Sequence, residues 1–140
     1  MLTTAELFLQ MEEAQLMVIS TVNATRPEAA VVGFTLLKDQ TIVLATSIHT
    51  RKFTNLVANS HVALVIGWDG WSVQIEGQAR VAEGEEAQQL ETMHIARNPH
   101  QAKLAGDPDQ RYVVVTPKWA RLTDYRSSDA RVEEVQFGTD

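Results

Sequence analysis

Residues 41–59, TIVLATSIHTRKFTNLVAN, pass from a strand pattern to a helix pattern within one short segment. Apolar and β-branched residues dominate Thr41–Thr46, which predicts a strand. Apolar residues then recur at helical spacing, and a threonine suited to capping precedes them, so we expect a short helix over Thr50–Asn59. Arg51 and Lys52 therefore fall at the first two positions of that helix.

Cations in the first turn of a helix are unfavourable unless an anion binds there. The N-terminus of a helix carries about half a positive charge and several unpaired N–H groups, so each Lys or Arg costs roughly 0.3–1 kcal/mol. A phosphate monoester would satisfy the N–H groups, the dipole and the side chains of Arg51 and Lys52 together. Alternatively, both cations are solvated and pair with some of the 18 acidic residues. The residues alone leave both interpretations open.

Outward from this segment, period-two strands alternate with amphipathic helices, and short polar turns favour antiparallel pairing. We expect one β-rich (α+β) domain over 1–140, in which six antiparallel strands form a barrel with peripheral helices and the tail after Arg126 is loosely ordered. The expected strands are Leu16–Val22, Glu28–Leu37, Thr41–Thr46, His61–Ile66, Trp71–Val81 and a last strand, Tyr112–Thr116 and Trp119–Tyr125, interrupted at Pro117, which must lie at an edge or bulge. The expected helices are Ala5–Gln15, N-capped by Thr3, then Thr50–Asn59 and Glu85–Arg97.

Composition excludes several classes of partner and site. A net charge of −6 disfavours nucleic acid and anionic membranes as partners. The absence of cysteine excludes disulfides, thiolate nucleophiles and cysteine zinc sites. No apolar stretch is long enough to cross a bilayer, and the first basic residue is Arg26, so we expect no secretory signal and a cytoplasmic location.

Motif spacing gives no catalytic signature. The four histidines show no metal-binding spacing, so we expect no metal site. Nucleophile-elbow, Gly-x-Gly-x-x-Gly and Walker motifs are all absent from the sequence. Chemistry by this chain would therefore depend on a cofactor.

Four blocks in order resemble the pyridoxamine 5'-phosphate oxidase-like FMN-binding split barrels. The blocks cover roughly Leu16–Tyr125 and are Ser20-Thr21-Val22 with Arg26-Pro27, Thr46 with Arg51-Lys52 and Asn55-Leu56, Val62-Ala63-Leu64 with Glu76-Gly77-Gln78-Ala79, and Thr116-Pro117. The resemblance implies a six-stranded antiparallel split β-barrel that holds FMN. It also implies a homodimer with two cofactor sites at its interface.

Residue by residue, the resemblance implies an FMN site. Arg51 and Lys52 would grip the phosphate, with hydrogen bonds from Thr46 and Ser47 nearby. The backbone over Val31, Val32 and Gly33 would lie along the isoalloxazine ring, and Ser72 or Gln74 would approach the cofactor. The family's vitamin B6 oxidases carry cations at the positions of Ala30 and Thr35, and an Arg-and-His clamp near the C-terminus, which this sequence lacks.

Several functions are compatible with this resemblance. The leading hypothesis is an FMN-dependent oxidoreductase acting on an unidentified small molecule. A second hypothesis is a non-catalytic flavin-binding protein that stores or senses FMN. Further alternatives are a split barrel that binds a deazaflavin or haem, or an interaction module without a ligand.

Overall fold

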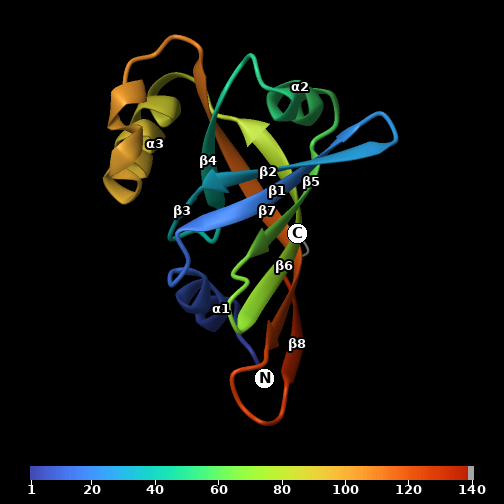
Figure 1. Cartoon of the computed structure of the whole chain (residues 1–140). Coiled ribbons are helices and arrows are strands. Elements are labelled where there is room, and N and C mark those ends of the chain that lie inside the picture. Colours follow the sequence, from blue (N-terminus) through green and yellow to red (C-terminus); the bar gives the residue numbers. More distant parts are fainter. Residues whose placement is uncertain (139–140) are drawn as a thin grey trace.

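The computed structural model describes residues 1–138, which form three α-helices, one 3-10 helix and eight strands (Figure 1). In chain order these are α1 (Thr4–Met11), β1 (Leu16–Asn23), β2 (Arg26–Gly33), β3 (Thr35–Leu36), β4 (Ile42–Ser47), α2 (Arg51–Ala58), β5 (His61–Ile66), β6 (Trp71–Val81), α3 (Gly84–Arg97), η1 (Pro99–Leu104), β7 (Gln110–Asp124) and β8 (Arg131–Gln136). No helix within this part of the chain is long and apolar enough to span a membrane.

All strand pairs are antiparallel, in the order β2-β1-β5-β6-β7-β4-β3, with β8 added beside β7. The sheet curls around one core, with α1 and α2 near its two ends and α3 against one side (Figure 1). This arrangement confirms the expected α+β split barrel. The strand number differs from the expected six, because the second strand is divided and the tail contributes a strand.

The division of the second strand moves the chain from one edge of the sheet to the other. β2 pairs with β1, whereas β3 pairs with β4 at the far end of the strand order. Phe34, between β2 and β3, is fully buried and anchors the crossing. Gly33 leaves room for the Asn98 side chain here, since a Cβ at this position would lie 2.5 Å from Asn98 Oδ1. The sequence predicts one strand over Glu28–Leu37, because largely apolar residues continue on both sides of this break.

Two other expectations about strands are corrected. β7 continues through Pro117 as one strand, so the expected interruption is wrong, whereas the expected bulge is confirmed by a register shift opposite Glu76 and Gly77. The tail expected to be loose after Arg126 instead forms β8, because Val135 and Phe137 are buried against the core. Residues 139 and 140 of that tail lie outside the described residues.

The strands separate two apolar clusters by alternation of their side chains. The larger fills the inside of the curled sheet and includes Ile19, Leu64 and Leu122. The smaller lies on the other face, where Leu90 of α3 packs in one cluster with Val114 of β7. Each face of the sheet therefore packs against its own cluster. Two side chains on opposite faces cannot contact the same ligand within one chain.

α1 is shorter than predicted but begins as expected. Thr3 Oγ1 accepts a hydrogen bond from the Glu6 backbone N–H at 3.0 Å, which confirms the cap. The helix ends at Met11 rather than near Gln15.

Candidate functional site

Hydroxyl groups fix the turn between β4 and the first residue of α2. Thr50 Oγ1 accepts from the Phe53 backbone N–H at 3.3 Å and donates to the Ser47 carbonyl at 2.9 Å. The buried Thr46 hydroxyl lies 2.7 Å from Thr50 Oγ1, and Ser47 Oγ accepts from the His49 N–H at 3.1 Å. Thr46 and Ser47 therefore shape the loop, and their hydroxyls are already engaged in it.

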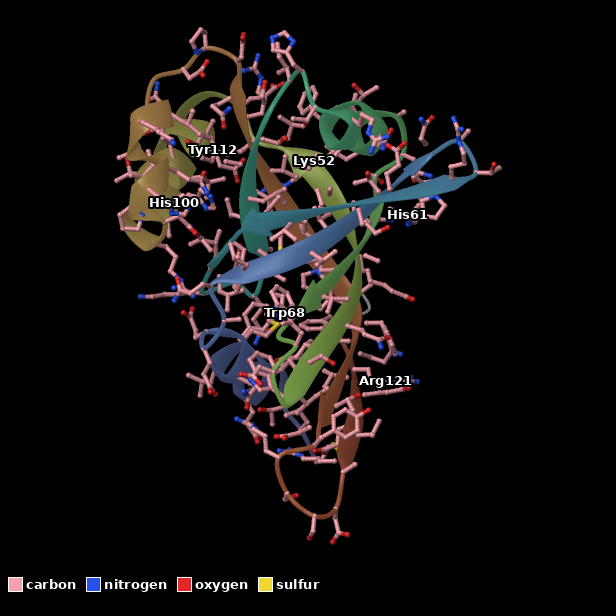
Figure 2. All side chains as sticks on the ribbon, in the orientation of Figure 1. Lys52, His61, Trp68, His100, Tyr112 and Arg121 are labelled. Carbon is pink, nitrogen blue, oxygen red and sulfur yellow. The ribbon has the colours of Figure 1, made fainter. Side chains whose placement is uncertain are left out.

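A small cavity of about 160 Å³ lies between the start of α2 and strands β1 and β2. Its lining residues are Ile19, Thr21, Glu28, Ala29, Ala30, Thr50, Arg51 and Lys52. Figure 2 shows Lys52 on α2, at the end of the sheet that this helix covers. The structure thus brings the predicted cation pair to a concave site next to β2.

Two of the residues that line this cavity, Arg51 and Lys52, carry free hydrogen-bond donors. Within residues 1–138, the backbone N–H groups of Arg51 and Lys52 have no acceptor, as expected for the first turn of a helix. The Lys52 side chain is half-buried, and burial lowers the pKa of its ammonium group. An anion bound at this position would offset that desolvation and use the free N–H groups.

A carboxylate also faces the cavity, and the sequence analysis missed it. Glu28 Oε1 accepts from Asn55 Nδ2 at 2.8 Å, and Glu28 Oε2 lies 3.1 Å from Arg51 Nη1. The buried Asn55 amide also donates to Thr21 Oγ1 at 3.0 Å. The hydrogen bond from Asn55, followed by the charge of Arg51, lowers the pKa of Glu28, so this carboxylate is ionised at neutral pH.

The expected flavin-contacting backbone lies on an edge strand. Within the described residues, β2 pairs only with β1, so its other edge has unpaired N–H and C=O groups. Val31 is exposed, Val32 packs partly against the core, and Gly33 is buried beneath Asn98. The outer part of β2 can therefore offer backbone hydrogen bonds to a planar ligand that extends from the cavity.

Ser72 and Gln74 do not meet the cation pair within one chain. Both lie on the outward face of β6, whereas the cavity is lined from the inward face by Ile19 and Thr21 of β1. Gln74 is paired with Arg121 of β7, which Figure 2 shows toward the opposite end of the molecule from Lys52.

No group of three or more His, Asp or Glu side chains that could hold a metal ion occurs within residues 1–138. His49 pairs with Asp109 at 3.0 Å on the surface near the β4–α2 turn. His94 is fully buried, with Nδ1 2.8 Å from Thr35 Oγ1. None of the histidines lines the cavity.

Comparison with known proteins identifies the family. The family model of pyridoxamine 5'-phosphate oxidase matches residues 3–124, which is most of the chain. The chain belongs to this family. A search of curated protein sequences gives no match.

Solved structures share the fold of this oxidase family member at low sequence identity. General stress protein 26 from Bacillus anthracis is 20% identical, with a TM-score of 0.78 over 96% of this chain and 98% of that one. A pyridoxamine 5'-phosphate oxidase-related, FMN-binding protein from Nostoc punctiforme is 11% identical, with a TM-score of 0.66 over 94% and 93%. A heme-binding protein from Mycobacterium smegmatis is 17% identical, with a TM-score of 0.80 over 97% of this chain but 59% of that one.

The residues present in this family member fit the phosphate of a flavin nucleotide, with one exception. Free N–H groups, Arg51 and Lys52 supply donors and positive charge, and the small side chains of Ala29 and Ala30 leave room beside them. Glu28 is the exception, because its negative charge lies among the same groups.

Proposed function

We propose that the chain binds FMN through the cavity at the start of α2 and acts as an FMN-dependent oxidoreductase on a small molecule. The observation that carries this proposal is the convergence of Arg51, Lys52 and two free backbone N–H groups on a cavity beside an edge strand. Membership of the pyridoxamine 5'-phosphate oxidase family and the FMN-binding relative from Nostoc punctiforme support FMN as the cofactor.

Each part of the site would have a distinct role. Arg51 and Lys52 would bind the phosphate, and the unpaired edge of β2 would offer backbone hydrogen bonds to the flavin. The flavin would supply the hydride- and electron-transfer chemistry, while the protein orients it and limits access of water. Pyridoxamine phosphate is disfavoured as the substrate, because Thr35 is buried against His94 and Ala30 carries no charge.

We also propose that the working form is a homodimer with its cofactor sites at the interface. Ser72 and Gln74 lie on the face of the sheet opposite the cavity, so they would reach a cofactor only in a second copy of the chain. The same outward face carries a groove of about 410 Å³ over β1, β5 and β6. A second copy of this chain would cover that groove.

A non-catalytic flavin carrier is the second candidate, favoured by one observation. The ionisable side chains lining the cavity are Glu28, Arg51 and Lys52, and all three are engaged with one another or placed for phosphate. A carrier needs no proton-transfer group, whereas many oxidoreductases use one. Reduction of bound FMN by a small-molecule donor, measured by loss of flavin absorbance, separates the two functions.

Replacing Arg51 and Lys52 together by Gln tests the phosphate site. FMN binding should weaken by at least about 2 kcal/mol, because a charge-assisted hydrogen bond is typically worth about 1.5–3 kcal/mol. Riboflavin, which lacks the phosphate, should bind wild type and variant almost equally. Affinities would be measured by fluorescence titration at low salt.

The matched control replaces Arg80 and Lys103 by Gln, which removes the same charge outside the cavity. It should leave FMN affinity unchanged. Full FMN affinity in the Arg51→Gln, Lys52→Gln variant would show that the pair is ordinary solvated surface.

A further inference from the structure

The Glu28 carboxylate lines the cavity and pairs with Arg51, as a bound anion would. Its side chain is only 16% exposed, and both of its carboxylate oxygens are engaged, one by Asn55 and the other by Arg51. Arg51 itself is 78% exposed, so this ion pair contributes little to stability. We therefore expect the Glu28–Arg51 pair to affect ligand binding in the cavity more than the stability of the fold.

The charge balance of the cavity depends on this residue. Arg51 and Lys52 carry two positive charges, and Glu28 cancels one of them. A phosphate monoester brings about −1.5 to −2 charges at neutral pH. It must either displace the carboxylate from Arg51 or lie close to it, and like charges at short range in a partly buried site are strongly unfavourable.

We propose that Glu28 competes with the ligand's phosphate for Arg51, so that the cavity holds a phosphorylated cofactor exchangeably instead of permanently. This inference rests on the proposed function, because it concerns the same cavity. The proposal assigns Glu28 a role in specificity. Its carboxylate lowers the affinity for ligands that carry a phosphate and leaves the affinity for their unphosphorylated forms unchanged. Asn55 holds the carboxylate toward the cavity through its second hydrogen bond to Thr21.

The test is the substitution Glu28→Gln, with FMN and riboflavin titrated in parallel. The Gln side-chain oxygen can still accept from Asn55, so the local structure is kept while the charge is removed. FMN should bind at least about tenfold tighter than to wild type, which corresponds to about 1.4 kcal/mol. Riboflavin affinity should change less than about twofold, since it carries no phosphate to be repelled.

The matched control is Glu86→Gln, which removes a carboxylate that also pairs with an arginine, Arg80, but lies on α3 outside the cavity. It should leave FMN affinity unchanged. Equal or weaker FMN binding by the Glu28→Gln variant would overturn the inference. Should thermal unfolding show that this variant does not fold, Glu28→Ala would be measured against the same expectation.

Inorganic phosphate separates failure of this inference from failure of the proposed function. If neither wild type nor Glu28→Gln binds FMN, the proposed function is wrong. Phosphate titration, followed by the amide NMR signals of Arg51 and Lys52, then decides the role of Glu28. Tighter phosphate binding by the variant would support competition by the carboxylate, and equal binding would overturn it.

Discussion

At the scale of single residues, His94 is the clearest buried ionisable group outside the cavity. It is fully buried beside the Tyr112 ring, with ring centroids 6.0 Å apart, and its Nδ1 lies 2.8 Å from the Thr35 hydroxyl. Burial lowers the pKa of His94 from 6.5 to about 4. The unfolded chain therefore takes up a proton between these values that the folded chain does not.

This shift predicts acid sensitivity. The stability that depends on a neutral His94 is fully present above pH 6.5 and is lost as the pH falls toward 4. The free energy of unfolding should therefore be roughly 2 kcal/mol lower at pH 5 than at pH 7.5. The His94→Gln variant, though less stable at pH 7.5, should not show this additional loss. Urea unfolding at the two pH values measures the difference. An equal fall in wild type and His94→Gln would contradict this role.

Of the eight residues that line the cavity, two, Arg51 and Lys52, were predicted as site residues from the sequence. The positions of Arg51 and Lys52 could be predicted because capping and helical spacing are local properties of the chain. Glu28 could not, since its meeting with Arg51 depends on the placement of the β1–β2 hairpin against α2, 23 positions away in sequence. The available signal was alternation along β2, where Glu28 shares the inward side with Ala30 and Val32.

At the scale of elements, β8 is a structural part of the domain. It pairs with β7 from Trp119 to Asp124, and Phe137 packs edge-on against Phe8 with ring centroids 6.2 Å apart. Phe137→Ala should therefore lower the free energy of unfolding by about 3 kcal/mol, as expected for removal of a buried aromatic side chain. Phe137 directly follows β8, and Val132→Ala, at a 57% exposed position within β8, should change the free energy of unfolding little. Equal unfolding free energies for Phe137→Ala and wild type would mean that β8 adds no stability.

The helices and most strands could be predicted because their hydrophobic periodicity depends only on residues close together in the sequence. The exceptions depend on tertiary contacts. The break at Gly33 packs against Asn98, far along the chain, and β8 contains only two apolar residues, Val132 and Val135. Neither feature has a local pattern strong enough to show it.

At the scale of the whole molecule, the proposed homodimer predicts the molecular mass of the protein in solution. The outward face of β1, β5 and β6 carries the groove that a second copy would cover. Light scattering at micromolar concentration should give about twice the 15.6 kDa chain mass. Replacing Ala63, an exposed residue of this face, by Arg should shift the protein toward the monomer, whereas Ala105→Arg, outside the groove, should not. A monomeric wild type would contradict the shared-site arrangement.

The most direct test of the central claim is equilibrium titration of the purified wild-type protein with FMN at low salt, followed by flavin absorbance and fluorescence. The account predicts saturable binding of FMN that is tighter than the binding of riboflavin, because Arg51, Lys52 and the free N–H groups of α2 recognise the phosphate. Absence of FMN binding, or equal affinity for FMN and riboflavin, would contradict it.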